Sequence, residues 1–75
     1  MMLASPKEIG LRLYKLRAER GQSGHWVAAR LRVSSVSYYR WEAGTRLPCL
    51  EYAFRMAELY KLSIEELFGT GPESR

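Results

Sequence analysis

The apolar positions near the N-terminus recur with the spacing of an amphipathic helix. Ile9, Leu13 and Leu16 lie at i, i+4 and i+7. They follow the sequence Ser-Pro-Lys-Glu at 5–8, which is a capping-box pattern with proline at the first helical position. Gly21 is placed to end the run as a C-terminal glycine. We therefore expect a first helix that begins at residue 6 and ends just before Gly21.

Serines placed before apolar runs predict where the next two helices begin. Ser23 can cap a short second helix that carries Trp26, Val27, Ala28 and Leu31. That helix breaks at Arg32-Val33. Ser34 can cap a third helix that runs through Glu42 and ends at Ala43-Gly44.

The C-terminal part of the chain predicts two more helices. The stretch 45–48 ends in Leu-Pro and is expected to be a loop, because proline moves the preceding residue out of helical geometry. A fourth helix is expected from about Leu50 to Tyr60. The sequence Ser-Ile-Glu-Glu at 63–66 is a second capping box that opens a short fifth helix. The expected fold is all-α, with five helices in one domain over residues 5–69 and a disordered tail over 70–75.

The second and third predicted helices are joined by a turn too short for an antiparallel arrangement, so they must cross steeply. That is the geometry of a helix-turn-helix. Ala28 is small enough to allow a close crossing. The residues expected on the inner face are Val27, Leu31, Val33, Tyr38 and Trp41. The residues expected on the solvent side of the third helix are Ser35, Val36, Tyr39 and Arg40.

Charge adds a first indication of function. The chain has 75 residues, 12 Lys+Arg against 8 acidic residues, and a net charge of +4. Residues 1–46 hold nine of the basic residues and only three glutamates, whereas residues 47–75 hold three basic residues and five glutamates. A basic half of this kind indicates a surface that faces a polyanion.

Several classes of function are excluded by composition. One cysteine and one histidine supply neither an internal disulfide nor the usual zinc ligands, so no metal or cofactor is expected. An enzyme is not expected either, because the chain has no Asp and no room for a deep pocket. No apolar run approaches the roughly 18 residues of a membrane span, and no signal peptide is recognisable. We expect a cytoplasmic protein that does not bind membranes.

The ordered spacing of these residues resembles the lambda-repressor-like (Cro/XRE-type) helix-turn-helix DNA-binding domains over about residues 9–68. The residues that carry the resemblance are Leu16, Arg17, Gly21, Ser23, Val27, Ala28, Leu31, Val33, Ser34, Ser37, Arg40, Glu42, Gly44, Pro48, Leu50, Ala57, Leu62, Ser63 and Leu67. The resemblance implies a five-helix fold with the third helix as recognition helix. It also implies a homodimer on a pseudo-palindromic operator in double-stranded DNA, as in small phage or plasmid repressors and restriction–modification controller proteins.

The open face of the third helix and the basic half supply the candidates for contacts to DNA. Base contacts are expected from Ser35, Val36, Tyr39 and Arg40. Arg40 could instead contact a phosphate or be an ordinary solvated charge, and Tyr39 could instead contact the DNA backbone or flank the core. Phosphate contacts are expected from Arg12, Ser23, Gly24, Arg30, Arg32, Ser34 and Arg46. Arg17 and Glu42 stand where family members form an ion pair that ties the recognition helix to the scaffold.

Two positions depart from the family pattern. Gly24 stands where family members usually have a glutamine that touches a phosphate, so only backbone groups and the helix terminus remain there. Arg32 stands where the turn usually has glycine. If this residue needs a positive φ, arginine costs on the order of 1 kcal/mol relative to glycine.

The fourth helix has more apolar surface than one small core requires. Its expected core face consists of Leu50, Ala53, Met56, Ala57 and Tyr60. The surplus apolar residues, which predict a homodimer interface, are Tyr52, Phe54, Leu59 and Phe68. RNA polymerase is a further candidate partner of such a regulator. The alternative function is a protein-interaction module of the same fold that has lost DNA binding.

Overall fold

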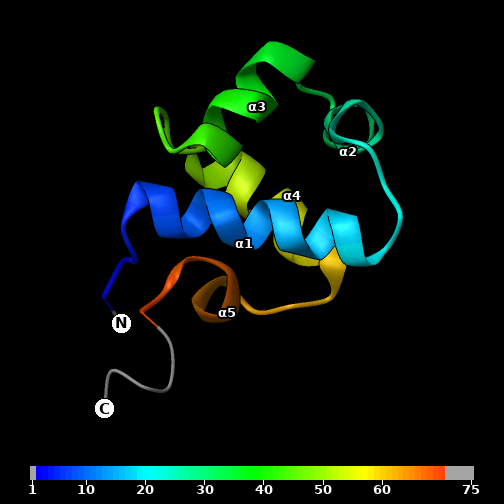
Figure 1. Cartoon of the computed structure of the whole chain (residues 1–75). Helices are drawn as coiled ribbons and strands as arrows, with labels where there is room; N and C mark the ends of the chain where they lie inside the picture. Colours follow the sequence, from blue (N-terminus) through cyan, green and yellow to red (C-terminus); the bar gives the residue numbers. More distant parts are fainter. Residues whose placement is uncertain (1, 71–75) are drawn as a thin grey trace.

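The computed structural model describes residues 2–70 and is built from α-helices (Figure 1). The helices are α1 (Pro6–Glu19), α2 (Gly24–Leu31), α3 (Ser35–Ala43), α4 (Leu50–Tyr60) and α5 (Ile64–Phe68). Within residues 2–70 the only strand-like pairing is an isolated antiparallel bridge between Leu3 and Gly69. The predicted all-α fold with five helices is confirmed.

Serine caps begin four of the five helices. The hydroxyl oxygens of Ser5, Ser23, Ser34 and Ser63 each accept a hydrogen bond from the backbone N–H three residues later. The full capping box forms at α5, where the Glu66 carboxylate also accepts from the backbone N–H of Ser63 at 2.8 Å. At α1 the Glu8 carboxylate instead lies 3.8 Å from the Arg12 guanidinium. The capping-box sequence at 5–8 therefore acts through its serine.

Four residues with positive φ end helices or turn the chain after them. Gly21 and Gly44 have φ values of +67° and +77°, as their positions in the sequence predict. Arg32 and Lys61 are not glycines, yet their φ values are 62° and 58°. The turn between α2 and α3 therefore needs a residue in the left-handed conformation at position 32. This is the case in which arginine carries a backbone cost relative to glycine.

The core lies around α1, which has α3 on one side and α5 on the other (Figure 1). Ile9 and Leu13 of α1 are fully buried. Gly10 allows α3 to approach closely, because a Cβ atom there would lie 2.2 Å from the carbonyl oxygen of Glu42. Ala28 is 2% exposed, in line with its predicted place in a close helix crossing. Most of the predicted inner face is buried, and Val33 packs against its edge.

Two assignments on the C-terminal helices are wrong. Leu50 is expected in the core but is 70% exposed, because it is the first residue of α4 and lines an open apolar hollow. Phe68 was expected on a surface patch but is 4% exposed. It is the last residue of α5 and belongs to the core cluster that the helices share.

The two ends of the described chain are held together by backbone hydrogen bonds. Ala4 N–H donates to Phe68 O at 2.8 Å, and Thr70 N–H donates to Met2 O at 2.9 Å. Thr70 is therefore part of the folded domain and not the first residue of the predicted tail. The remainder of that tail, 71–75, lies outside the described residues.

Over residues 2–70, no helix is both long and apolar enough to cross a membrane. The same residues contain no cluster of three or more potential metal-ligating side chains.

Candidate nucleic-acid interface

The segment from α2 to α3 has the two-faced character that its sequence predicts. The turn is closed by a hydrogen bond of 3.0 Å from Val33 N–H to Ala28 O. On α3, Tyr38 and Trp41 face inward and are 0% and 4% exposed. On the outer side Val36 is 60% exposed and Arg40 is also exposed, while Ser35 is half-buried. One face of α3 is thus anchored in the core and the other is open to a partner.

Side chains of α4 hold the end of α2 and the turn in place. Arg55 donates from Nη1 to Leu31 O at 2.9 Å, and the Tyr52 hydroxyl donates to Arg32 O at 3.3 Å. These contacts satisfy carbonyls that the end of a helix leaves without intrahelical partners. Neither role is predicted from the sequence. The signal available was only general, because carbonyls at a helix end need donors but the sequence does not show which residues supply them.

The structure brings Arg17 and Glu42 together as a two-point ion pair between α1 and α3. Arg17 Nε lies 2.5 Å from Glu42 Oε2, and Nη2 lies 3.1 Å from Oε1. A third donor, Nη1, reaches Gln22 O at 3.2 Å. The hydrogen bond to Glu42 raises the pKa of Arg17 above its ordinary value, so the guanidinium stays charged. The C-terminal end of α3 is thereby tied to both α1 and the α1–α2 loop.

Tyr39 projects outward from α3 but lies against the start of α2. A Cβ atom at Gly24 would lie only 2.3 Å from Tyr39 Cζ and 2.4 Å from its hydroxyl oxygen. The His25 ring meets the Tyr39 ring edge-on, with centroids 5.6 Å apart. Tyr39 is 37% exposed, less than Val36. The space next to Gly24 is therefore filled by an aromatic ring.

The exposed basic residues predicted to contact phosphates lie on α2, in the α2–α3 turn and in the loop after α3. Arg30, Arg32 and Arg46 are exposed. The Arg30 guanidinium lies 5.4 Å from the centroid of the Trp26 ring, which is itself 42% exposed. Ser23 and Ser34 are exposed at the N-termini of α2 and α3, where their hydroxyl oxygens cap the helices.

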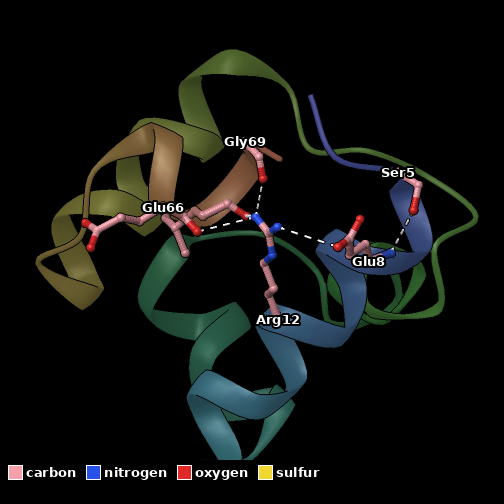
Figure 2. Close-up of polar contacts among 6 residues, drawn as sticks. Ser5, Glu8, Arg12, Glu66 and Gly69 are labelled. Atoms are coloured by element: carbon pink, nitrogen blue, oxygen red, sulfur yellow. Dashed lines mark hydrogen bonds and ion pairs between the residues drawn. The ribbon is translucent and has the colours of Figure 1, made fainter. Parts of the chain in front are cut away.

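Arg12 does not belong with this basic set, and its prediction as a phosphate contact is corrected. Its guanidinium points from α1 to the end of α5 (Figure 2), where Nη1 donates to Gly69 O at 2.6 Å and to Leu67 O at 3.2 Å. α5 lies on the side of α1 opposite α3 (Figure 1). The sequence does not reveal this because the two partners are 55 and 57 positions away. Arg12 caps the last turn of α5.

The predicted dimer residues are not a single exposed patch. Tyr52 is half-buried, with its ring centroid 5.5 Å from that of Trp41, and Leu59 packs against the core. Phe54 is the one member that is strongly exposed, at 56%. An apolar hollow of about 240 Å³ borders the start of α4. It is lined by Leu3, Ile9, Leu47, Pro48, Leu50, Ala53, Ile64 and Phe68.

Comparisons with known proteins agree with this architecture. A family model described as a helix-turn-helix domain matches residues 8–67. No match was found among curated proteins. Among solved structures, the chain is similar to a transcriptional regulator from Listeria innocua, with 27% identity and a TM-score of 0.80 over 95% of this chain. The chain spans 63% of the length of that regulator.

Two further solved structures have the same fold. The chain is similar to the DNA-binding domain of BldD from S. venezulae, with 26% identity and a TM-score of 0.72, over 85% of this chain and 96% of that one. It also resembles the clp gene regulator ClgR from Corynebacterium glutamicum, with 20% identity and a TM-score of 0.76, over 85% and 68% of the two chains. At that identity the second likeness concerns the fold alone. The family match, which includes all of α2, the left-handed turn and α3, shows that this chain belongs to the helix-turn-helix domain family.

Proposed function

We propose that the chain is a sequence-specific DNA-binding transcriptional regulator that reads the major groove with α3. The observation that carries the proposal is the division of α3 into a buried face at Tyr38 and Trp41 and an open face at Val36 and Arg40. A helix held in this way can enter the major groove without leaving its own core. The likeness to the Listeria transcriptional regulator and to the BldD DNA-binding domain supports the same function.

The chemistry of the exposed side chains indicates which of them contact bases and which contact phosphates. Arg40 is the candidate for a base-edge contact to guanine, and Val36 can contact a thymine methyl group. The half-buried Ser35 adds a short polar group beside them. Arg30 and Arg46 carry charge without a salt-bridge partner among residues 2–70 and are candidates for phosphate contacts. They would hold the protein on any sequence.

The capping serines remain able to contact phosphates. Ser23 and Ser34 each use the hydroxyl oxygen to accept a backbone N–H, at 3.0 Å and 3.1 Å. A hydroxyl that accepts in this way still has its own proton to donate. We propose that these protons meet DNA phosphates at the N-termini of α2 and α3, where the helix dipoles also favour negative charge.

Selection from random double-stranded DNA tests the function directly. Purified protein is incubated with a pool of random duplexes, and the bound fraction is sequenced after several rounds at near-physiological salt. We expect an enriched sequence with two-fold pseudo-symmetry, because a short helix reads only a few base pairs and a dimer doubles that number. A folded protein that enriches no duplex would contradict the proposal.

The variant Arg40→Ala distinguishes a sequence-specific base contact from a phosphate contact that any DNA sequence offers. We expect it to weaken binding to the selected operator by roughly 1–3 kcal/mol and binding to random DNA much less. Arg30→Ala is the matched control: as a phosphate contact it should weaken both DNAs alike and lower the salt slope by about one unit. Salt titrations of both variants on both DNAs measure this. Equal losses for Arg40→Ala on operator and random DNA would make Arg40 a backbone contact.

Fewer exposed apolar residues are available for the proposed homodimer interface than the sequence predicts. Phe54 and Leu50 are 56% and 70% exposed and lie one helical turn apart on α4, and Leu50 also lines the apolar hollow. We propose that this part of α4 pairs with its two-fold copy, in place of the wider interface expected from the sequence. A patch of this kind is costly to leave in water. Two-fold pairing would also match the symmetry expected of an operator.

A further inference from the structure

The position of Tyr39 differs from that of the other outward residues of α3. Val36 and Arg40 project into open space, whereas the Tyr39 ring is seated on the first residue of α2. An added Cβ at Gly24 would come within 2.3, 2.4 and 2.5 Å of three atoms of this ring and hydroxyl. Contacts below 3.0 Å are essentially never seen for real Cβ atoms. Gly24 and Tyr39 are therefore complementary in size.

The same ring also contacts α1 and its neighbour on α3. The Arg17 guanidinium lies 5.8 Å from the Tyr39 centroid, and this guanidinium is itself held by Glu42. Tyr38, which is fully buried, meets Tyr39 edge-on at 5.7 Å. On the α2 side His25 completes the surroundings at 5.6 Å. Tyr39 thus lies where α1, α2 and α3 meet.

We infer that Tyr39 is a positioning residue: its ring, seated on Gly24, sets the angle at which α3 leaves α2 and so aims Val36 and Arg40 at the DNA. The inference rests on the proposed function and changes the role of Tyr39 from base reader to spacer. Val36 and Arg40 are three residues before and one residue after Tyr39. A rotation of α3 that follows loss of this ring would displace both readers together.

This arrangement also accounts for glycine at position 24. Any side chain there would have to displace the ring. Alanine is a better helix former than glycine, so Gly24→Ala would be favourable if the Tyr39 ring did not have to move. A loss caused by Gly24→Ala can therefore be attributed to the ring of Tyr39.

A double-mutant cycle tests the inference. The variants are Gly24→Ala, Tyr39→Ala, the double variant, and Tyr39→Phe as the matched control that keeps the ring. Each is measured for thermal unfolding without DNA and for affinity to the selected operator and to single-base-pair variants of it. Affinities for the single-base-pair variants show whether α3 is misplaced on the DNA, which a general loss of stability would not reveal.

We expect Gly24→Ala and Tyr39→Ala each to weaken operator binding by about tenfold or more and to flatten the preference at several base pairs at once. The double variant should be no weaker than Tyr39→Ala alone, because a methyl group at 24 has nothing to displace once the ring is gone. Tyr39→Phe should stay within about twofold of the wild type. If Gly24→Ala does not fold, recovery of folding in the double variant supports the same contact.

Two results would overturn the inference while leaving the proposed function intact. The first is a wild type and Gly24→Ala that share the same operator affinity and base preference. The second is a Tyr39→Phe or Tyr39→Ala variant that loses preference at a single base pair, since that pattern belongs to a direct base reader. A wild type that selects no duplex overturns the proposed function instead, and the unfolding cycle still shows whether Gly24 and Tyr39 are coupled.

Discussion

Arg17 and Glu42 meet where neither side chain is more than 15% exposed. In such surroundings the ion pair is weak evidence for net stabilisation, because both charges have lost most of their water. Removing one partner is a different matter, since the remaining charge stays desolvated and unpaired. Removing one partner should therefore lower the free energy of unfolding by more than the intact ion pair adds to it.

Glu42→Gln should therefore lower the free energy of unfolding by roughly 3 kcal/mol. Glu51→Gln is the matched control, because Glu51 also pairs with an arginine, Arg55, but its side chain is 66% exposed. The control should cost less than about 1 kcal/mol. Urea unfolding followed by circular dichroism measures both. A Glu42→Gln variant no less stable than Glu51→Gln would show that the Arg17 guanidinium does not depend on Glu42.

Tyr38 gives the domain a sensitivity to alkaline pH. Burial raises the pKa of the Tyr38 phenol, and the nearby Glu42 carboxylate adds to the rise. Above the ordinary tyrosine pKa of about 10 the unfolded chain loses this proton while the folded chain keeps it, so stability is present below that pH and falls above it. The Tyr38 hydroxyl is buried, and among residues 2–70 no group meets the geometry of a hydrogen bond to it, although Glu42 lies close enough to affect its pKa.

Tyr38→Phe should thus change stability little at neutral pH and reduce the loss of stability above about pH 10. Tyr60→Phe is a comparison, because burial raises the pKa of Tyr60 as well and its hydroxyl is equally without a partner in the described chain. Urea midpoints on both sides of the tyrosine pKa give the slopes. Identical alkaline slopes in the wild type and in both variants would rule out these phenols as the cause.

At the scale of the elements, short helices depend on their ends. The helices of this domain have between 5 and 14 residues, so capped and left-handed positions form a large share of each. Serine caps and glycines in the left-handed region are ordinary solutions. Arg32 is not, because its φ of 62° places a long side chain in a conformation that favours glycine. We propose that the charge of Arg32 has a use at this turn, as a contact to a DNA phosphate.

Arg32→Gly should stabilise the domain by about 1 kcal/mol through relief of backbone strain. If the guanidinium contacts a phosphate, the same change should lower the salt slope of DNA binding by about one unit. Lys61→Gly is the matched control, since Lys61 has a φ of 58° but lies between α4 and α5. It should stabilise equally and leave the salt slope unchanged. A salt slope unaffected by Arg32→Gly would remove Arg32 from the phosphate contacts.

At the scale of the whole molecule, the proposed functions occupy two surfaces. The outward side of α3 and the exposed arginines of α2 and the loops form the candidate DNA surface. The exposed apolar residues of α4 and the hollow beside them form the other. Between them α1 supplies most of the contact to α3 and, through Arg12, to the end of α5. Each surface can therefore be altered while the other is measured.

Phe54→Asp should convert the proposed dimer into a monomer, because a carboxylate on each copy would be buried in the interface. Leu11→Asp is the matched control, since Leu11 is 52% exposed, much like Phe54, but lies on α1 and not on α4. Sedimentation equilibrium over a range of micromolar concentrations distinguishes the chain mass of 8.7 kDa from its double. Wild-type protein that stays at 8.7 kDa throughout would exclude the dimer.

Features that depend on neighbours along the chain could be predicted from the sequence. Helix starts followed from Ser23, Ser34 and Ser63, and helix ends followed from Gly21 and Gly44, because caps and left-handed turns are local requirements. The buried and open faces of α3 followed from the helical period alone. These interactions span a few residues, and the chain has little freedom to satisfy them in another way.

Contacts between groups far apart in the chain depend on how the helices pack. Arg12 caps α5, and Arg55 reaches the end of α2. Packing brings the free carbonyls of these helix ends within reach of arginines whose sequence positions indicate only a charged surface residue. Phe68 is buried since it completes a core formed by several helices, whereas Leu50 projects beyond that core. Tyr39 faces outward by helical period, yet the missing side chain at Gly24 lets its ring lie on α2. Such partners depend on the packing of whole helices, which local pattern does not specify.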